Sequence, residues 1–499
     1  MVRILYVPFD HLNFDFGVLK EANPGTDVIA LVESQRMVTG RPWHQERLFF
    51  LISSARHFAA EAAERGFEVH YVKAPTTIEG LEKIQAEVAG IREISQPSAI
   101  EIFCAEPSSF KQYSQLQEFG VRFVENDLFL TTRKLFFMWA ERQKTFVMEN
   151  FYRAQRVRLG ILVANGEPAG DRWNYDSENR LPPPKNYEWP QYLWHERDAI
   201  DIEVAAELNF EPTKTWATTR AGALAQLDNF ITNHLHGFGP YEDAIAADNW
   251  ALHHSLLSPY LNNGLLNARE VVAAALTAYE EQKAPIESVE AFVRQVIGWR
   301  EYIHGMYWFL GEGYREQNQL GASRKLLPLF NDSSKTRMNC VRSVVADVEE
   351  RAWAHHIPRL MVLSNLALTS GVNPQEFLDW MRENFVDASE WVMVPNIIGM
   401  ATHADGGLLM TKPYASGGAY LNRMTQHCKA CAYDPKKRVG EDACPFTTLY
   451  WDFLDRHKET FAKNHRMTQQ IWGLNKLADL PEVRMRAQFV IDGLQKGEI

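Results

Sequence analysis

The sequence LHHSLLSPYLNNGLL, residues 252–266, sits in the middle of a long helical region of this 499-residue chain. Beyond Thr218 apolar residues recur at the three- and four-residue spacing of amphipathic or buried helices, and strong strand signals are absent. Helices are therefore expected in TRAGALAQLDNFITNHL (219–235), AREVVAAALTAYEEQ (268–282) and SVEAFVRQVIGWREYIHGMYWFL (288–310).

The first third of the chain has a different pattern, in which strand-like and helix-like segments alternate. Short runs rich in Val and Ile occur in VRILYVPF (2–9), VIALV (28–32), VHYVKA (69–74) and AIEIFC (99–104), with a helical segment at 46–66. This alternation predicts a doubly wound parallel sheet covered by helices. Ligands of such sheets bind beyond the carboxyl ends of the strands, where Asp10 and Glu33 follow the first two strands. No G-x-G-x-x-G follows the first strand, which argues against an ordinary NAD site.

We therefore predict three parts. An α/β domain spans residues 1–130, a less regular linker spans 131–215, and a large all-α domain spans 216–499. The linker contains LPPPKNYEWPQYLW (181–194), a Pro-rich and aromatic segment that is expected to pack on the surface.

Composition excludes several classes of protein. The chain is 46% hydrophobic and 23% charged, which is ordinary for a globular protein. No apolar run is long enough for a membrane span, and MVRILYVPF is expected to be a strand and not a signal peptide. Only five cysteines occur, so we expect a reducing cytoplasm and no disulfide scaffold. The net charge of −11 argues against non-specific coating of nucleic acid, although the segment 412–476 is net basic and is either a basic face or a solvated surface.

Four of the cysteines form a candidate metal site. Cys428 and Cys431 are a C-x-x-C pair, Cys444 follows them, and Cys340 stands alone upstream. Thiolates select zinc or iron–sulfur clusters, and the spacing alone does not separate these two or exclude four unrelated buried cysteines. Cys104 lies in an apolar run and is expected to belong to the core.

Four stretches of the sequence resemble motifs of a known family. LHHSLLSPYLNNGLL is similar to the S-x-L-S-P-Y-L-x-x-G-x-L signature of photolyases and cryptochromes. Three further stretches resemble the same family: WREYIHGMYW (299–308), AHHIPRLM (354–361), and the region 387–420 with VPNIIGM and TKPYASGGAY. One Cys before the His-His pair and three after TKPY resemble the iron–sulfur bacterial cryptochromes and photolyases, including the prokaryotic (6-4) photolyases. The resemblance implies an α/β antenna-type domain, a helical FAD-binding domain, and a [4Fe-4S] cluster on the four cysteines.

The resemblance also implies residues that bind FAD. Hydroxyls and backbone amides at the helix start would hold the flavin pyrophosphate. Arg359 and Asp387 would pair beside the isoalloxazine ring, unless they are an ordinary helix–helix ion pair, and Asn396 would approach flavin N5. The expected FAD-binding residues are Ser255, Leu257, Ser258, Arg300, Arg359, Asp387 and Asn396.

A further set would act on damaged DNA. His356 matches the proton donor to a (6-4) lesion, and its neighbour His355 points elsewhere because adjacent helical residues diverge by about 100°. Tyr414 and Tyr420 would line the lesion pocket, and Gln295 could bind a base edge, although each also suits a core position. The expected catalytic set is His355, His356, Gln295, Tyr414, Tyr420 and the flavin-near Trp380.

The sequence departs from the family in two places. Of the tryptophan chain that carries electrons to the flavin in the family, Trp380 matches the flavin-near member, but Asp332 replaces the next member, and Met381 and Ser389 replace flanking tyrosines. Trp353 and Trp391 are candidate detours. In the antenna crevice Asp10 and Glu33 suit 6,7-dimethyl-8-ribityllumazine, whereas Met37 and Gly40 replace two further contacts. A lumazine, another chromophore, or none are all compatible with these residues.

The leading hypothesis is light-driven repair of (6-4) photoproducts by a monomeric enzyme that binds UV-damaged DNA. The alternatives are a cyclobutane dimer photolyase, a cryptochrome sensor without repair, and a zinc-stabilised nucleic-acid-binding protein without flavin. The cluster would be structural. The basic residues that could hold phosphates are Lys436, Lys437, Arg438, Lys463 and Arg466.

Overall fold

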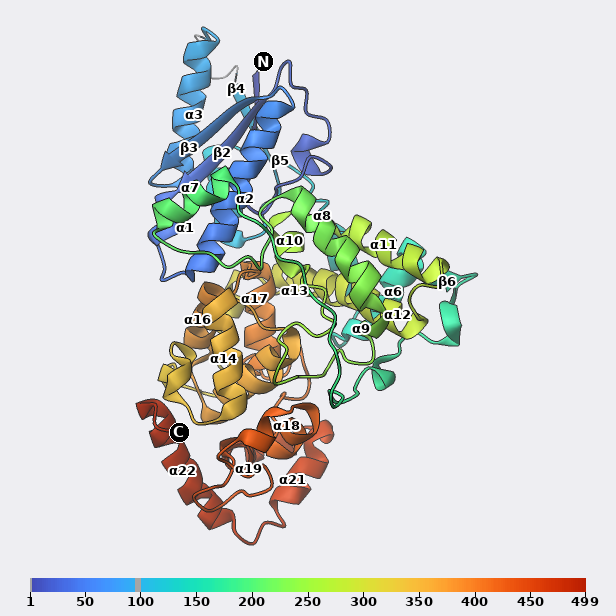
Figure 1. Ribbon diagram of the computed structural model, residues 1–499, viewed down its shortest axis with the longest axis vertical. Coiled ribbons are helices and arrows are strands. Elements are labelled where there is room, and N and C mark those ends of the chain that lie inside the picture. The colour runs from blue at the N-terminus through green and yellow to red at the C-terminus, as the bar shows by residue number, and fades with distance from the viewer. Residues whose placement is uncertain (1, 95–99) are drawn as a thin grey trace.

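The computed structural model describes residues 2–94 and 100–499, and it has three layers along its long axis (Figure 1). A parallel sheet at one end has the strand order β3-β2-β1-β4-β5. The strands are β1 (Val2–Tyr6), β2 (Val28–Ser34), β3 (Glu68–Ala74), β4 (Ile100–Ala105) and β5 (Arg122–Val124). This confirms the predicted fold class. The sequence pattern did not show the three-residue β5, and Ala99, expected in the fourth strand, lies outside the described residues.

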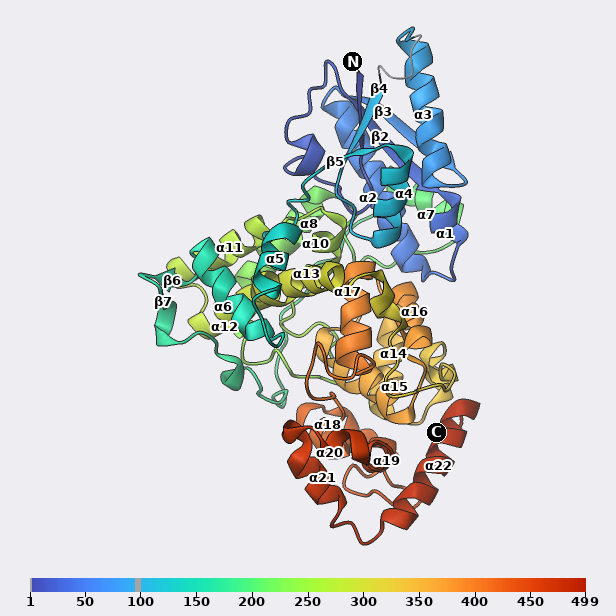
Figure 2. The ribbon, with the colours of Figure 1, turned by 180° about the vertical axis from the view of Figure 1, so that it is seen from behind.

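Helices cover both faces of this sheet, as buried parallel sheets require. Alternate residues of β1 and β2 enter two different apolar clusters because successive strand side chains point to opposite faces. Helix α2 (Gln45–Glu64) packs on one face, while α3 (Thr77–Ile91) and α4 (Phe110–Phe119) pack on the other; α2 is in front in Figure 1 and α4 in front in Figure 2. The short α1 (Gln35–Thr39) follows β2.

The segment after the sheet contains α5 (Arg133–Ala140), α6 (Met148–Leu159), the β6–β7 hairpin (Val163–Ala164 and Glu167–Pro168) and α7 (Ala199–Leu208). Residues 181–194 contain no helix or strand, yet they are held firmly. Trp189 is buried, the hydroxyl of Tyr187 lies 2.9 Å from Nε2 of His253, and the carbonyl of Gln191 accepts from Asn229. The Pro-rich segment therefore packs on the helical part of the molecule.

In the described residues beyond Thr218 the chain is helical, with only isolated β-bridges. The central helices are α8 (Arg220–Asn229), α9 (Leu235–Phe238), α10 (Ser258–Asn263), α11 (Ala268–Glu280), α12 (Ile286–Val293), α13 (Glu301–Leu310), α14 (Asn339–Arg351), α15 (Asn365–Ser370), α16 (Pro374–Asn384) and α17 (Glu390–Pro395). A C-terminal layer, red in Figure 1, contains α18 (Gly418–Met424), α19 (Pro445–Arg456), α20 (Lys458–Ala462), α21 (Thr468–Leu474) and α22 (Leu480–Lys496).

Several of these helices change to π-helical winding along their length. The π segments are η5 (Phe230–His234), η6 (Arg294–Arg300), η10 (Pro358–Ser364) and η11 (Asn396–Ala401). Segment η6 joins α12 to α13, so the single helix predicted at 288–310 is continuous but carries a wider turn. Such turns are rare in proteins overall, and those that occur are frequently found at functional sites.

A buried carboxyl group fastens the linker to the sheet domain. Glu46, in the first turn of α2, is fully buried and accepts hydrogen bonds from the Thr213 amide (2.9 Å) and hydroxyl (2.8 Å). Burial raises the pKa of Glu46 to about 7, although the Thr213 donors and two arginines favour the ionised form. Folding therefore favours the protonated acid, and stability falls as pH rises from 4.5 to about 7.

The Glu46→Gln variant should remove this pH dependence. Its amide retains both contacts with Thr213 but does not ionise, so the variant should gain roughly 3 kcal/mol over the wild type between pH 5 and pH 8. Urea unfolding at the two pH values measures this difference. Glu82→Gln, at an exposed position of α3, serves as the control. An equal difference at both pH values would contradict the assignment.

Candidate functional site

The predicted site centres on the carboxylate of Asp387. Arg359 donates to it in a bidentate pair, with Nη1 3.0 Å from Oδ1 and Nη2 2.9 Å from Oδ2. Ser258, the first residue of α10, donates its hydroxyl at 2.6 Å, and Asn262 donates to the Asp387 carbonyl at 2.7 Å. Four residues from three separate parts of the sequence are thereby fixed to one another.

The residues of the 252–266 motif before Ser258 position its hydroxyl for the contact with Asp387. Ser255 accepts weakly from the amide of Leu257 (3.4 Å), and Leu257 is fully buried. Positive φ angles at Leu252 and Leu256 turn the chain so that α10 starts at Ser258. The motif thus places two serine hydroxyls at the helix start.

Two other predicted FAD residues lie on π segments. Asn396 starts η11 and donates from Nδ2 to the Val392 carbonyl at 2.8 Å, so its Oδ1 has no bond within its own helix. Arg300 ends η6, is nearly buried, and pairs with Glu301 at 2.9 Å while its guanidinium lies over Phe129. Arg300 therefore contacts protein groups, whereas no donor to the Oδ1 atom of Asn396 is found among the described residues.

Three histidines meet next to the Arg359–Asp387 pair. His355 is buried and His356 is exposed, which agrees with the predicted divergence of these neighbours. The ring of His254 stacks on His355 at 3.9 Å, and ring nitrogens of all three histidines lie within 4.8 Å of one another. Desolvation lowers the pKa of each, to about 4 for His356, whose ring solvent reaches although protein atoms surround it and where Arg359 and Arg294 add to the effect. All three rings are therefore neutral at pH 7.

His254 was not predicted, although it directly precedes Ser255 in the motif. Glu242 was also not predicted; it accepts a short hydrogen bond from the amide of Gln295 and lies 3.6 Å from Arg294. Burial raises the pKa of Glu242 to about 8, so its protonated form predominates at neutral pH. The available signal was a pair of acidic residues, Glu242 and Asp243, between Tyr241 and Ala244 in GPYEDAI.

The two predicted lesion-pocket tyrosines are partly buried and close to acidic groups. Burial and the charge of Asp243 raise the pKa of Tyr420 to about 12, and burial also raises the pKa of Tyr414. Both phenols are therefore protonated at neutral pH and can donate hydrogen bonds.

The four predicted cysteine ligands line one small cavity. Cys340 is in the first turn of α14, Cys428 and Cys431 lie in and after the 3-10 turn η12 (His427–Ala430), and Cys444 precedes α19. Burial raises the pKa of Cys340, and the other three thiols raise it further; burial raises the pKa of Cys444 to about 11. Thiols that disfavour one another's ionisation are stabilised by a cation among them, so this donor set fits a soft metal centre.

The antenna residues and Trp380 have surroundings that the sequence did not predict. Glu33 accepts from Tyr71 at 2.5 Å and from Arg56 at 3.1 Å, whereas the Asp10 carboxylate lies 3.9 Å from His11. Trp380 is buried among three phenylalanines: Phe330, Phe377 and Phe385. Of the replaced positions, Asp332 and Ser389 precede the short helices η9 (Ser333–Lys335) and α17, and Met381 is buried in α16.

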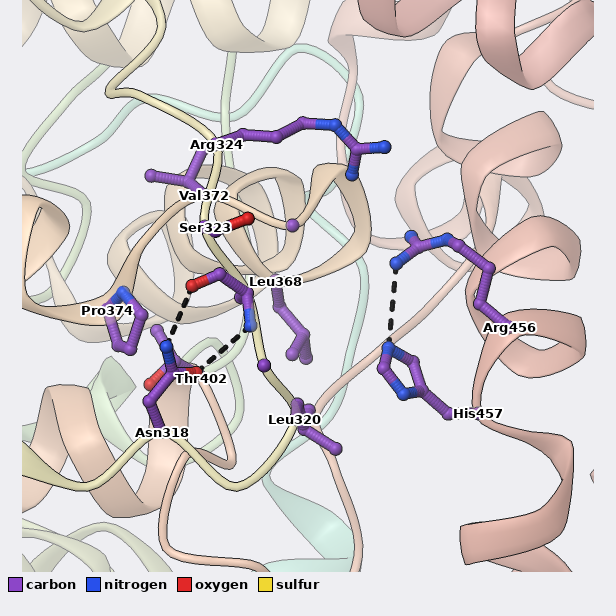
Figure 3. A pocket seen from close by; sticks show the side chains of 13 residues that line it. Asn318, Leu320, Ser323, Arg324, Leu368, Val372, Pro374, Thr402, Arg456 and His457 are labelled. Atoms are coloured by element: carbon purple, nitrogen blue, oxygen red, sulfur yellow. Dashed lines mark hydrogen bonds between the residues drawn. The ribbon is translucent and has the colours of Figure 1, made fainter.

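A separate cavity of about 270 Å³ contains none of the predicted site residues. Figure 3 shows Arg324 and Arg456 on its wall, with His457 beside Arg456. Arg456 is held by Asp452 and the Thr369 carbonyl, and Arg324 donates to the Ser370 carbonyl. The cavity lies between the loop 318–324 and the end of α19, so it belongs to the junction with the C-terminal layer.

Comparison with known proteins assigns the family. The chain is 38% identical over 483 residues to a (6-4) photolyase from Agrobacterium fabrum, which covers 94% of each protein. The chain belongs to the photolyase and cryptochrome family. The family description Deoxyribodipyrimidine photo-lyase-related protein matches residues 5–221. Membership of the family implies FAD as the cofactor.

Two solved structures have the same photolyase fold. A bacterial class III photolyase from Agrobacterium tumefaciens matches 99% of this chain and 98% of its own, with a TM-score of 0.57 and 14% identity. A cryptochrome from Synechocystis matches 80% of this chain and 82% of its own, with a TM-score of 0.54 and 14% identity. No helix in the described ranges has both the length and the apolar character needed to cross a membrane.

The buried polar groups of this photolyase site fit the flavin that the family implies. The Asp387 carboxylate and the Ser258 hydroxyl offer polar contacts, and Nε2 of both His254 and His355 is buried without a hydrogen-bond partner among the described residues. Unpaired buried donors and acceptors are costly, so a polar ligand that contacts them stabilises the fold.

The Asp387→Asn variant should destabilise the apoprotein strongly. It removes the charge that compensates the part-buried guanidinium of Arg359, which should cost roughly 3–5 kcal/mol in urea unfolding. Glu376→Gln, which removes an ion pair with the exposed Lys325, should cost no more than about 1 kcal/mol. Equal losses in the two variants would show that the Asp387 contact is not central to the fold.

Proposed function

We propose that this protein repairs UV-damaged DNA in blue light, with (6-4) photoproducts as its substrate and FAD as its cofactor. The observation that supports this most directly is the Arg359–Asp387–Ser258 contact beside three histidines, in a chain closely similar to a (6-4) photolyase. FAD supplies an electron in light, and the protein holds the flavin and the lesion, excludes water and moves a proton.

In this proposal Asp387, Ser258 and Asn396 hold the flavin, and Arg359 fixes the orientation of Asp387. His356 is the general acid because it is the exposed member of the histidine cluster. Tyr414, Tyr420 and Gln295 contact the flipped lesion, with Gln295 oriented by Glu242. His254 stacks on His355 and keeps the cluster in place.

A proton donor must carry its proton at the working pH. The pKa of His356 is about 4 in the protein alone, so negative charge from the bound flavin and DNA has to raise this pKa toward neutrality. Repair should therefore decline as pH rises above the pKa of His356 in the complex. This coupling would restrict proton donation to the fully assembled complex.

We further propose that the four cysteines hold a [4Fe-4S] cluster with a structural role. Cys340 belongs to the central helices, and the other three belong to the C-terminal layer, so a cluster would join the two. An antenna chromophore such as a ribityl-lumazine is proposed for the crevice at Asp10 and Glu33. The unpaired thiols support a reducing cytoplasm as the setting.

The basic residues near the C-terminus differ in their capacity to hold DNA phosphates. Lys437 pairs with Asp442 and Arg438 with Asp479, which reduces their net charge. Arg466 donates to Thr411, the first residue of the TKPY segment. Lys436 and Lys463, together with Arg466, are therefore the proposed phosphate contacts of a monomer.

The function is tested with chemically reduced protein, blue light and two oligonucleotides, one with a (6-4) product and one with a cyclobutane dimer. We expect repair of the (6-4) product, and we expect His356→Asn to lose it by at least about 100-fold because a general acid is missing. His236→Asn, an exposed histidine outside the cluster, should retain full activity. Repair of the dimer alone would change the substrate assignment, and repair of neither would favour a sensor.

The cluster is tested by iron and sulfide analysis of protein purified without oxygen. Cys431→Ser should lose most of the iron and weaken the C-terminal layer toward proteolysis, because one of four ligands is gone. Cys104→Ala, which alters a buried cysteine of β4, should keep the iron. Zinc in place of iron would refute the iron–sulfur assignment and would still support a metal site on the four cysteines.

A further inference from the structure

A continuous series of aromatic rings leads from Arg359 to the molecular surface. The ring of Trp353 lies 5.8 Å from the guanidinium carbon of Arg359, and Trp250 lies 5.4 Å from Trp353 between ring centroids. Tyr192 follows at 4.8 Å from Trp250, and Trp194 at 5.1 Å from Tyr192. Trp194 is 59% exposed, so the series ends in water.

In the part of the chain that the structure describes, aromatic contacts connect neither of the other two candidate tryptophans to the surface in this way. The ring neighbours of Trp380 are phenylalanines, whose rings are much harder to oxidise than indole or phenol. Trp391 lies against Phe129 and His304. If Trp380 or Trp391 is oxidised, none of its aromatic contacts among the described residues is an indole or phenol that can reduce it. An oxidised Trp353, in contrast, can be reduced by the neighbouring Trp250.

We propose that Trp353, Trp250 and Trp194 are the electron-transfer route that reduces the flavin in light, which rests on the FAD site of the proposed function. Trp353 gives one electron to the photoexcited oxidised flavin and becomes a radical cation. Trp250 then gives one electron to Trp353, and Trp194 gives one electron to Trp250. At the surface the Trp194 radical cation releases its N–H proton to water, and an external thiol then donates a hydrogen atom to the neutral Trp194 radical and becomes a thiyl radical.

The surroundings of Trp250 and Trp353 favour onward electron transfer over deprotonation of their radical cations. The Nε1 atoms of Trp250 and Trp353 are buried and have no hydrogen-bond partner in the described ranges, so no base takes their proton and the radical cation can pass on its charge. Arg351 lies 4.6 Å from the Trp250 ring, but Asp347 and Glu350 each pair with it at 2.6 Å and compensate its charge.

The outer rings are held in position although they lie in a segment without regular structure. Tyr192 and Trp194 are flanked by Gln191, whose carbonyl accepts from Asn229, and by His195, whose amide donates to the Lys214 carbonyl at 2.8 Å. Trp194 lies no more than about 10 Å from Trp250 because Tyr192 contacts both. Tyr192 therefore bridges the two indoles without having to be oxidised itself.

The route is tested by the rate of flavin photoreduction in FAD-loaded full-length protein with a thiol reductant. Trp250→Phe and Trp353→Phe should lose most of this rate, and Trp194→Phe should lose the long-lived radical seen by transient absorption. Trp472→Phe, which alters a tryptophan of α21 that is 62% exposed, should match the wild type. FAD content is measured in each variant so that loss of flavin is not mistaken for loss of transfer.

A second readout follows oxidation of the protein and not the absorbance of the flavin. Illumination in air should oxidise Trp194, as mapped by mass spectrometry of peptides, and Trp250→Phe should abolish this oxidation. Tyr192→Leu provides a test in the surface segment if a buried variant fails to fold. Wild-type photoreduction in Trp250→Phe, or its loss in Trp380→Phe alone, would overturn the proposal. Repair by chemically reduced protein is measured separately, so failure of the repair function is distinguished from failure of this route.

Discussion

The bidentate pair of Arg359 and Asp387 is the contact on which the arrangement of this photolyase site depends. A part-buried guanidinium without its carboxylate is unfavourable, so the two elements that carry these residues have to approach each other. Ser258 adds a third element, because its hydroxyl shares the same carboxylate. The position of α10, and with it the whole 252–266 motif, follows from this requirement.

The π-helical segments have a related role. Arg359 lies in η10, Asn396 begins η11, and Gln295 and Arg300 lie in η6. A π turn inserts an extra residue into a helix and so changes the direction of the side chains that follow. Because such turns lose ideal hydrogen-bond geometry, their coincidence with three site-bearing helices indicates that side-chain placement outweighs helix regularity here.

The sequence allowed most of the architecture and part of the site to be predicted. The four longer strands and α2 followed from apolar periodicity, and the gathering of four cysteines followed from their spacing. The pairing of Arg359 with Asp387 followed from family motifs. Neither periodicity nor the family motifs identified Glu242 and His254 as site residues, because their significance comes from partners that are distant in the chain. Periodicity also cannot reveal a π turn, since one extra residue in a long helical run leaves the apolar pattern almost unchanged.

Apolar contacts join the C-terminal layer to the central helices. One small cluster of the layer is built around Phe453, Leu454 and Phe461. Residues of α19 and α22, among them Phe446 and Ile491, belong to the same large apolar cluster as the central helices. Cys340 comes from α14, whereas the other three thiols come from the C-terminal layer, so the proposed centre on all four would add a covalent link at a junction that apolar packing already forms.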